Sequence, residues 1–181
     1  INVSIGNSAL NLNTSGTQNV AVGNLASYSN QTGSYSTAMG YEAVKNPTGG
    51  SNTGIGYRAA RGGSGTISGQ YHTAVGHESL VNFTTASSNT AIGYQSMYYT
   101  NTGGANDNVA VGREALEANT SSNNVAIGYQ ALTANQTGTR NVAIGLLSFE
   151  KQVNTNDNTG VGYLAGRYMT GAGNTAIGSY T

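Results

Sequence analysis

The chain contains no cysteine and no tryptophan, a single proline, and few charged residues, because seven lysines and arginines balance seven aspartates and glutamates among 181 residues. Without cysteine, no disulfide framework can hold the fold together. Without a basic cluster, no counterion-release energy is available for binding a phosphate backbone, so we expect no nucleic acid partner. No apolar run approaches the roughly 18 residues that a membrane span requires, so we expect no membrane insertion.

Large apolar side chains are also scarce. Valine, isoleucine, leucine and phenylalanine together supply 31 of the 181 residues, whereas glycine, asparagine, threonine and serine supply 90. This composition approaches that of chains that bury too little apolar surface to fold alone, but the large net charge typical of disorder is absent. The apolar residues must therefore be arranged economically or shared between chains.

A five-residue motif recurs eleven times, so residues 1–181 form a single repeat region. Most copies read Asn, then Val or Thr, then Ala or Gly, then Ile or Val, then Gly, and looser copies begin at Asn2, Ser36 and His72. The repeats are 16 to 20 residues long. The closing glycines are Gly6, Gly23, Gly40, Gly56, Gly76, Gly93, Gly112, Gly128, Gly145, Gly162 and Gly178.

Within each copy the side chains alternate in character with period two, which predicts a short strand with one face inside. The residue before the glycine is always β-branched or methionine, as at Ile55 and Ile92, and we predict that these residues form one buried column. A small residue lies three positions after most glycines, and a larger apolar one such as Leu116 or Leu132 often follows it. We expect this second apolar position to face the same core, with polar turns closing the repeat.

A strand this short cannot bury its face alone, so stacking of the repeats is required. We predict an all-β parallel β-solenoid of about eleven coils, in which every strand pairs with its equivalents in the adjacent coils. The glycines then mark a bend, or a place where another backbone comes too close for a Cβ. The asparagines would stack into an amide ladder. Eleven coils at about 4.8 Å spacing give a rod roughly 50 Å long.

The motif copies at Asn89, Asn124 and Asn174 resemble the NSVAIG head repeats of trimeric autotransporter adhesins. They are still more similar to the NTAIGYQAL-type repeats of phage tail fibres and bacterial surface fibres. This resemblance implies a left-handed, homotrimeric solenoid in an extracellular setting, either a virion tail fibre or a cell surface. Composition favours association independently, because a single thin roll would expose much of its limited apolar surface.

Two strings that begin at Gly54 and Gly160 imitate the GxGxxA dinucleotide motif. In both, glycine has replaced the alanine of the repeat, and no strand–helix–strand pattern follows. We therefore expect no cofactor. A hexapeptide at residues 5–10 fits the repeat of left-handed β-helix acyltransferases, but only one such hexad occurs per coil. Acyl transfer remains an alternative, and the main prediction is that the chain is not an enzyme.

His72 and His77 are the only histidines, and they lie in one repeat beside Glu78. A metal site would need a further convergent ligand, and acid–base catalysis would need a pocket. The only aspartates are Asp107 and Asp157, too few for a calcium site in each repeat. We expect no metal and no catalytic residue, and we interpret both histidines as surface members of their columns.

Two repeats are longer than the others, with extra material at residues 61–71 and 98–107. Insertions in solenoids often form binding loops, and tyrosines beside polar groups suit a cell-surface glycan or receptor. Simple length variation in a tolerant turn is the alternative. A column of tyrosines directly after the motif glycine is expected to be partly exposed (Tyr41, Tyr57, Tyr94, Tyr129 and Tyr163). The candidate contact residues are Arg61, Tyr71, His72, His77, Tyr98, Tyr99, Asn101 and Asp107.

The sequence thus predicts a structural or adhesive fibre segment, part of a longer fibrous chain, that spaces and displays host-binding or surface-binding elements. One alternative is a solenoid that binds a repetitive solid, such as ice or polysaccharide, through an exposed threonine column. Valine replaces threonine in five copies, which favours an inward position for that column. The threonines concerned are Thr37, Thr53, Thr73, Thr90, Thr159 and Thr175.

Overall fold

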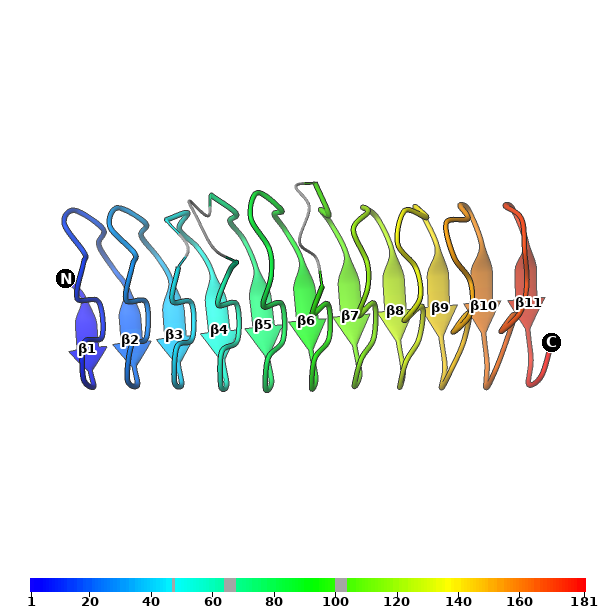
Figure 1. The fold of residues 1–181 in the computed structure, drawn as a ribbon, viewed down its shortest axis with the longest axis horizontal. Coiled ribbons are helices and arrows are strands. Elements are labelled where there is room, and N and C mark those ends of the chain that lie inside the picture. Colours follow the sequence, from blue (N-terminus) through cyan, green and yellow to red (C-terminus); the bar gives the residue numbers. More distant parts are fainter. Residues whose placement is uncertain (47, 64–67, 100–103) are drawn as a thin grey trace.

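The computed structural model describes residues 1–46, 48–63, 68–99 and 104–181, which form one solenoid without helices in these ranges (Figure 1). Each motif copy supplies one strand of three residues. The strands are β1 (Val3–Ile5), β2 (Val20–Val22), β3 (Thr37–Met39), β4 (Thr53–Ile55), β5 (Thr73–Val75), β6 (Thr90–Ile92), β7 (Val109–Val111), β8 (Val125–Ile127), β9 (Val142–Ile144), β10 (Thr159–Val161) and β11 (Thr175–Ile177).

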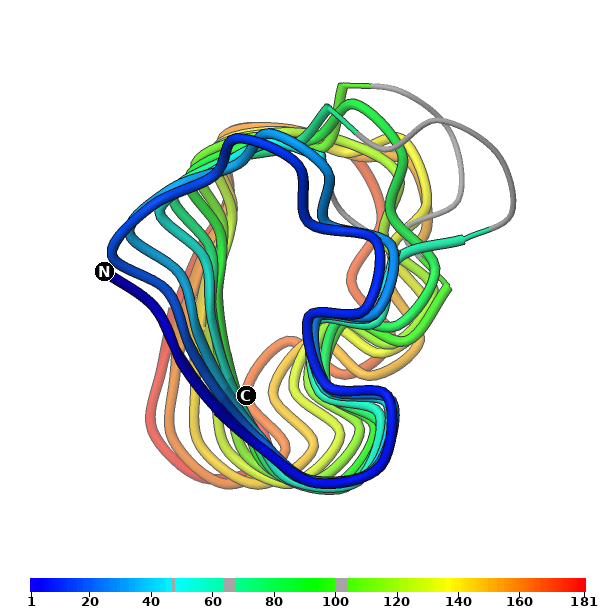
Figure 2. The same ribbon diagram turned by 90° about the vertical axis from the view of Figure 1, so that its left-hand side faces the viewer.

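All strands belong to one parallel sheet in sequence order, from β1 at one end of the rod to β11 at the other. Equivalent motif residues pair throughout, as Thr73 pairs with Thr90 and Val75 with Ile92. Viewed along the rod, the coils lie over one another (Figure 2). The predicted in-register parallel stack is therefore confirmed.

The prediction of a buried Ile/Val/Met column is wrong, because the strands turn the opposite face toward the core. The middle residue of the strand points inward, and Ala38, Ala91 and Ala126 are completely buried. The residue before the glycine points outward instead, so that Ile92 and Ile127 are each 38% exposed. The coil is too narrow for the larger side chain. Even at Gly54, a Cβ would lie 2.6 Å from Cγ2 of Val44.

The larger core residues come from the turn that follows the strand, as predicted for the second apolar position. Leu80, Met97, Leu116 and Leu132 are completely buried there. These residues have φ between 50° and 51°, in the left-handed region that non-glycine residues rarely occupy. The sequence carries no glycine at these positions, so this backbone conformation was not predicted.

The motif glycines fulfil both predicted roles. They have φ between 127° and 137°, which side-chain-bearing residues rarely adopt. A Cβ at Gly6 or Gly93 would also lie 2.6 Å from the carbonyl oxygen of the glycine in the next coil. The glycine column therefore allows both the bend at the end of each strand and the close stacking of coils.

The motif asparagines form the predicted amide ladder inside the coil. The Oδ1 of Asn141 accepts hydrogen bonds from the backbone N–H of Asn158 at 3.1 Å and from its Nδ2 at 3.1 Å. The Nδ2 of Asn141 donates in turn to the carbonyl of Thr155 at 2.7 Å and to the Oδ1 of Asn124 at 3.2 Å. Each asparagine thus ties its strand to the adjacent coil and to the turn of its own repeat.

Candidate functional site

The residues predicted to contact a receptor lie in several columns around the coil and do not form a single site. The exception is a small group in which Tyr98 interacts electrostatically with Arg61 and with Glu78, and Glu78 lies 3.8 Å from Nδ1 of His77. Tyr71 and Asp107 immediately precede the asparagine column, and both are exposed. His77 follows a motif glycine, and its side chain is 50% exposed. Tyr98 and Tyr99 lie beyond the core turn, with their rings 4.6 Å apart and perpendicular. Asn101 lies outside the described residues.

The segments taken as insertions are largely part of the coils. Backbone N–H groups of Gly63 and Ser68 donate to the carbonyls of Phe83 and Thr84 in the next coil. In the other long repeat, the N–H of Tyr99 donates to the carbonyl of Glu117 at 2.8 Å. Gly63, Ser68 and Tyr99, which were predicted to lie in protruding loops, are therefore part of the coils.

His72 is buried with 1% of its surface exposed, so its predicted surface position is wrong and it is not available to a receptor. Its Nδ1 accepts a hydrogen bond from the backbone N–H of Asn89 at 3.3 Å, and its Nε2 donates to the carbonyl of Ala86 at 2.8 Å. These two contacts reproduce those of the asparagine side chain in other coils. Burial lowers the pKa of His72 to about 4, although donation from its Nε2 to the carbonyl of Ala86 opposes this effect.

We expect His72 to make stability depend on pH. Its pKa is about 4 in the folded chain and 6.5 when unperturbed, so the unfolded chain binds more protons between these values. The free energy of unfolding should therefore fall by about 2 kcal/mol between pH 7 and pH 5. Urea titrations at both pH values measure this difference.

The matched variant His72→Asn restores the residue found at this position in other coils, so it should remove the histidine contribution without breaking the ladder. His77→Asn changes an exposed histidine and should retain the full pH dependence. An equal loss of stability on acidification in the wild-type chain and in His72→Asn would contradict the assignment.

An ion-pair cluster connects the coils of β3, β4 and β5. Glu42 lies 2.6 Å from Nζ of Lys45, 3.0 Å from Nε of Arg58 and 3.0 Å from Nε of Arg61. Arg58 also lies 3.7 Å from Glu78. Burial raises the pKa of Glu42, but the contacts with the three cations outweigh this effect and hold the pKa below its usual value. Since Arg61 is engaged here, its contact with a receptor would require breaking an existing ion pair.

The part of the tyrosine column from Tyr41 to Tyr129 forms a stack, and the predicted partial exposure of the column is confirmed. Tyr41 stacks on Tyr57 at 5.4 Å, and His77 stacks between Tyr57 and Tyr94 at 4.7 and 5.4 Å. Arg113 continues the column, 5.5 Å from the ring of Tyr94. Because the ring faces cover one another, mainly ring edges are available to a ligand. Stacking of sugars on these rings, the usual mode for aromatic side chains, is therefore restricted.

The outward face of the sheet is a continuous uncharged surface, which reasoning from the sequence missed. Two side chains of every strand lie on this face, the Thr/Val position and the Ile/Val/Met position. None of these residues is charged, and the face extends from β1 to β11 along the whole rod (Figure 1). The sequence contained a signal for this orientation of the strands. The middle residue of every motif copy is small and lies between two larger residues, which indicates a narrow interior.

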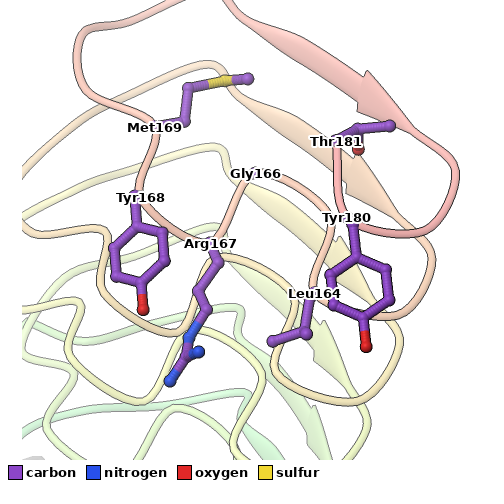
Figure 3. A pocket seen from close by; sticks show the side chains of 7 residues that line it. All are labelled: Leu164, Gly166, Arg167, Tyr168, Met169, Tyr180 and Thr181. Carbon is purple, nitrogen blue, oxygen red and sulfur yellow. The ribbon is translucent and has the colours of Figure 1, made fainter.

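A pocket of about 470 Å³ lies at the β11 end of the solenoid (Figure 3). Gly166 occupies the core-turn position that Phe149 fills one coil earlier, and Tyr168 and Tyr180 are 71% and 74% exposed. Leu132 and Phe149, the equivalents of Gly166 in the two preceding coils, are completely buried. The pocket is thus the uncovered face of the last coil. Its lining residues are Leu164, Gly166, Arg167, Tyr168, Met169, Tyr180 and Thr181.

Among the described residues, no group of three or more histidine, aspartate or glutamate side chains is arranged to hold a metal ion. The same residues contain no helix that is long and apolar enough to span a membrane. Comparison of the chain with protein-family models, curated proteins and solved structures gave no match. Functional inference therefore depends on the solenoid and its surfaces.

Proposed function

We propose that this chain is a rigid, extracellular fibre segment that holds binding elements away from a virion or cell surface, and that three copies associate through the outward face of the sheet. The left-handed winding implied by the sequence resemblance is part of this proposal. The observation that carries it is the uncharged face of valine, isoleucine, methionine and threonine side chains that runs the full length of the rod. Such a continuous face is typical of a surface that is covered in the assembled protein.

The energetics are consistent with association. Each strand contributes two partly exposed side chains to the face. If each gains somewhat less than 1 kcal/mol on burial, three complete faces contribute on the order of 40 kcal/mol. Forming a trimer from monomers requires two association steps, each costing about 4 to 15 kcal/mol in lost freedom. Burial of the valine, isoleucine and methionine side chains of the face therefore favours association.

Sedimentation equilibrium at micromolar concentration tests the assembly, and we expect the mass of a trimer. The variant Ile127→Glu places a charge on the face, on β8, and should yield monomers. Its far-ultraviolet dichroism should be unchanged, because Ile127 points away from the core. The matched control Val153→Glu adds the same charge at a 44% exposed position off the sheet and should remain trimeric. A monomeric wild-type chain would contradict the proposed assembly.

One observation favours the alternative of binding to a repetitive solid. The threonine column was expected to point inward, but Thr53, Thr73 and Thr90 lie on the outward face with their side chains partly exposed. Their spacing of about 4.8 Å gives a regular, flat array. Measurable thermal hysteresis, or adsorption to crystalline polysaccharide by a monomeric chain, would support this alternative over the trimeric fibre.

A further inference from the structure

The residue that precedes each motif copy lies at a corner of the coil, and these residues form a corner column along the rod. Ile1, the N-terminus in Figure 2, is its first member and marks the corner. From β7 to β10 the corner column is polar or charged, and Nε of Arg140 lies there 2.6 Å from Oδ1 of Asp157. From β3 to β6 it carries no charge and consists of Tyr35, Ser51, Tyr71 and Ser88.

The two tyrosines of the corner column are more exposed than those of the stacked column. Tyr35 and Tyr71 are 67% and 63% exposed, whereas Tyr57 and Tyr129 in the stack are each 38% exposed. Among the described residues, the rings of Tyr35 and Tyr71 contact no other aromatic ring and no guanidinium group. Their faces are therefore not covered by another ring and are available to a ligand. Open aromatic faces suit the apolar faces of sugar rings.

The backbone holds these two tyrosines in one line along the rod. Tyr35, Ser51 and Tyr71 have φ of 63°, 60° and 60°, and each lies two residues before a strand that pairs in register with the next. Ser51 alone separates the two tyrosines in the corner column, so they lie two coils apart. At about 4.8 Å per coil the separation is about 9.6 Å. A chain of sugars lying along the rod can therefore reach both rings.

Free hydroxyl groups accompany the tyrosines in the same coils. The first outward position of the strand is threonine from β3 to β6 and valine from β7 to β9, where the corner column has no tyrosine. The hydroxyls of these threonines and of Ser51 and Ser88 have no hydrogen-bond partner within the described part of the chain. Each can both donate to and accept from a sugar hydroxyl. The threonines are Thr37, Thr53, Thr73 and Thr90.

We propose that the corner of β3 to β6 binds a neutral, extended polysaccharide chain along the rod, with sugar rings stacked on Tyr35 and Tyr71 and sugar hydroxyls bonded to the adjacent serines and threonines. Neither column carries a charge in these coils, so an anionic glycan gains no attraction there. A β-linked glucan such as cellulose fits, because its straight chain turns the same sugar face to one side at every second residue. An α-linked glucan such as amylose is helical and does not.

This inference goes beyond the proposed fibre and does not depend on its assembly. The third outward position is isoleucine, valine or methionine in all eleven strands, so it suits the centre of a contact between copies. The corner column lies outside both outward positions of the strand and borders the face on the threonine side. The ligand is a single soluble chain, in contrast to the repetitive solid considered above.

Isothermal titration calorimetry of the whole chain with cellohexaose tests the proposal, and we expect binding that maltohexaose, an α-linked chain of as many glucoses, does not show. Tyr35→Asn and Tyr71→Asn introduce the residue that occupies the corner column at Asn123, where φ is 62°, so the fold should be retained. Each should weaken binding about five- to tenfold, and the double variant should abolish it. The control Tyr129→Asn removes a ring of the stacked column, where asparagine occurs at Asn24, and should bind normally.

Three results would overturn the inference: no binding of cellohexaose, equal binding of maltohexaose, or unchanged affinity in the double variant. Far-ultraviolet dichroism checks the fold of each variant, and Tyr35→Ser and Tyr71→Ser, with the residue found at Ser51, replace an asparagine variant that fails to fold. Sedimentation of the same samples tests the assembly separately. A monomeric chain that still binds cellohexaose would contradict the trimer and leave the glycan site intact.

Discussion

Replacement of Gly93 by alanine is expected to destabilise the solenoid by at least about 4 kcal/mol, because it combines overpacking against a neighbouring backbone with backbone strain. Gly93 has φ of 131°, and its new Cβ would lie 2.6 Å from the carbonyl oxygen and 2.7 Å from the carbonyl carbon of Gly112. Both atoms belong to the backbone of the next coil, so a side-chain movement cannot relieve the overlap. Urea unfolding followed by far-ultraviolet dichroism, at matched protein concentration, measures the change.

Gly104→Ala separates the backbone strain from the steric overlap. Gly104 has φ of 121°, similar to that of Gly93, but a Cβ there would meet no atom of the described residues within 4 Å. The strain alone should cost about 1 to 3 kcal/mol. If the two alanine variants were equally destabilised, the close approach of stacked coils would not explain the glycine column.

The second large effect is expected for Asn141→Ala, which should lower the free energy of unfolding by about 3 kcal/mol. Asn141 is completely buried, and its removal leaves the backbone N–H of Asn158 and the carbonyl of Thr155 without the partners they now have. Each buried group left unpaired costs about 1 to 3 kcal/mol. The measurement is again urea unfolding, with hydrogen exchange at Asn158 as a local readout.

Asn11→Ala is the matched control, because Asn11 is exposed in a turn and lies outside the ladder. It should change the free energy of unfolding by less than about 0.5 kcal/mol. A loss of stability in Asn11→Ala comparable to that in Asn141→Ala would show that asparagine content, rather than the internal ladder, determines stability.

Much of the fold could be predicted from the repeats. The period and the alternation predicted parallel coils in register, and the invariant glycine predicted a close approach between backbones. The burial of His72 could also have been inferred from its column, since the asparagines in that column lie inside the coil. This burial was missed because the prediction relied on the usual exposure of histidine at protein surfaces and not on the position of His72 in the asparagine column.

The scattered arrangement of the candidate receptor contacts could not be predicted from spacing. Their positions depend on where each turn passes around the coil, and the backbone at many turn residues has positive φ although they are not glycine. Glu42 and Arg58 are examples, with φ of 53° and 54°. Nothing in the local sequence indicates such a conformation, because hydrogen bonds to adjacent coils impose it.

The sequence by itself determined the stack, since eleven equivalent strands with glycine and asparagine at constant positions can satisfy their backbone groups by pairing in register. Only the tertiary structure decided which face of the strands is inside. Alternation of side chains is the same for either orientation, and the usual expectation places the larger residue in the core. Here the closure of a short coil leaves room only for a methyl group at the strand, so valine, isoleucine and threonine point outward.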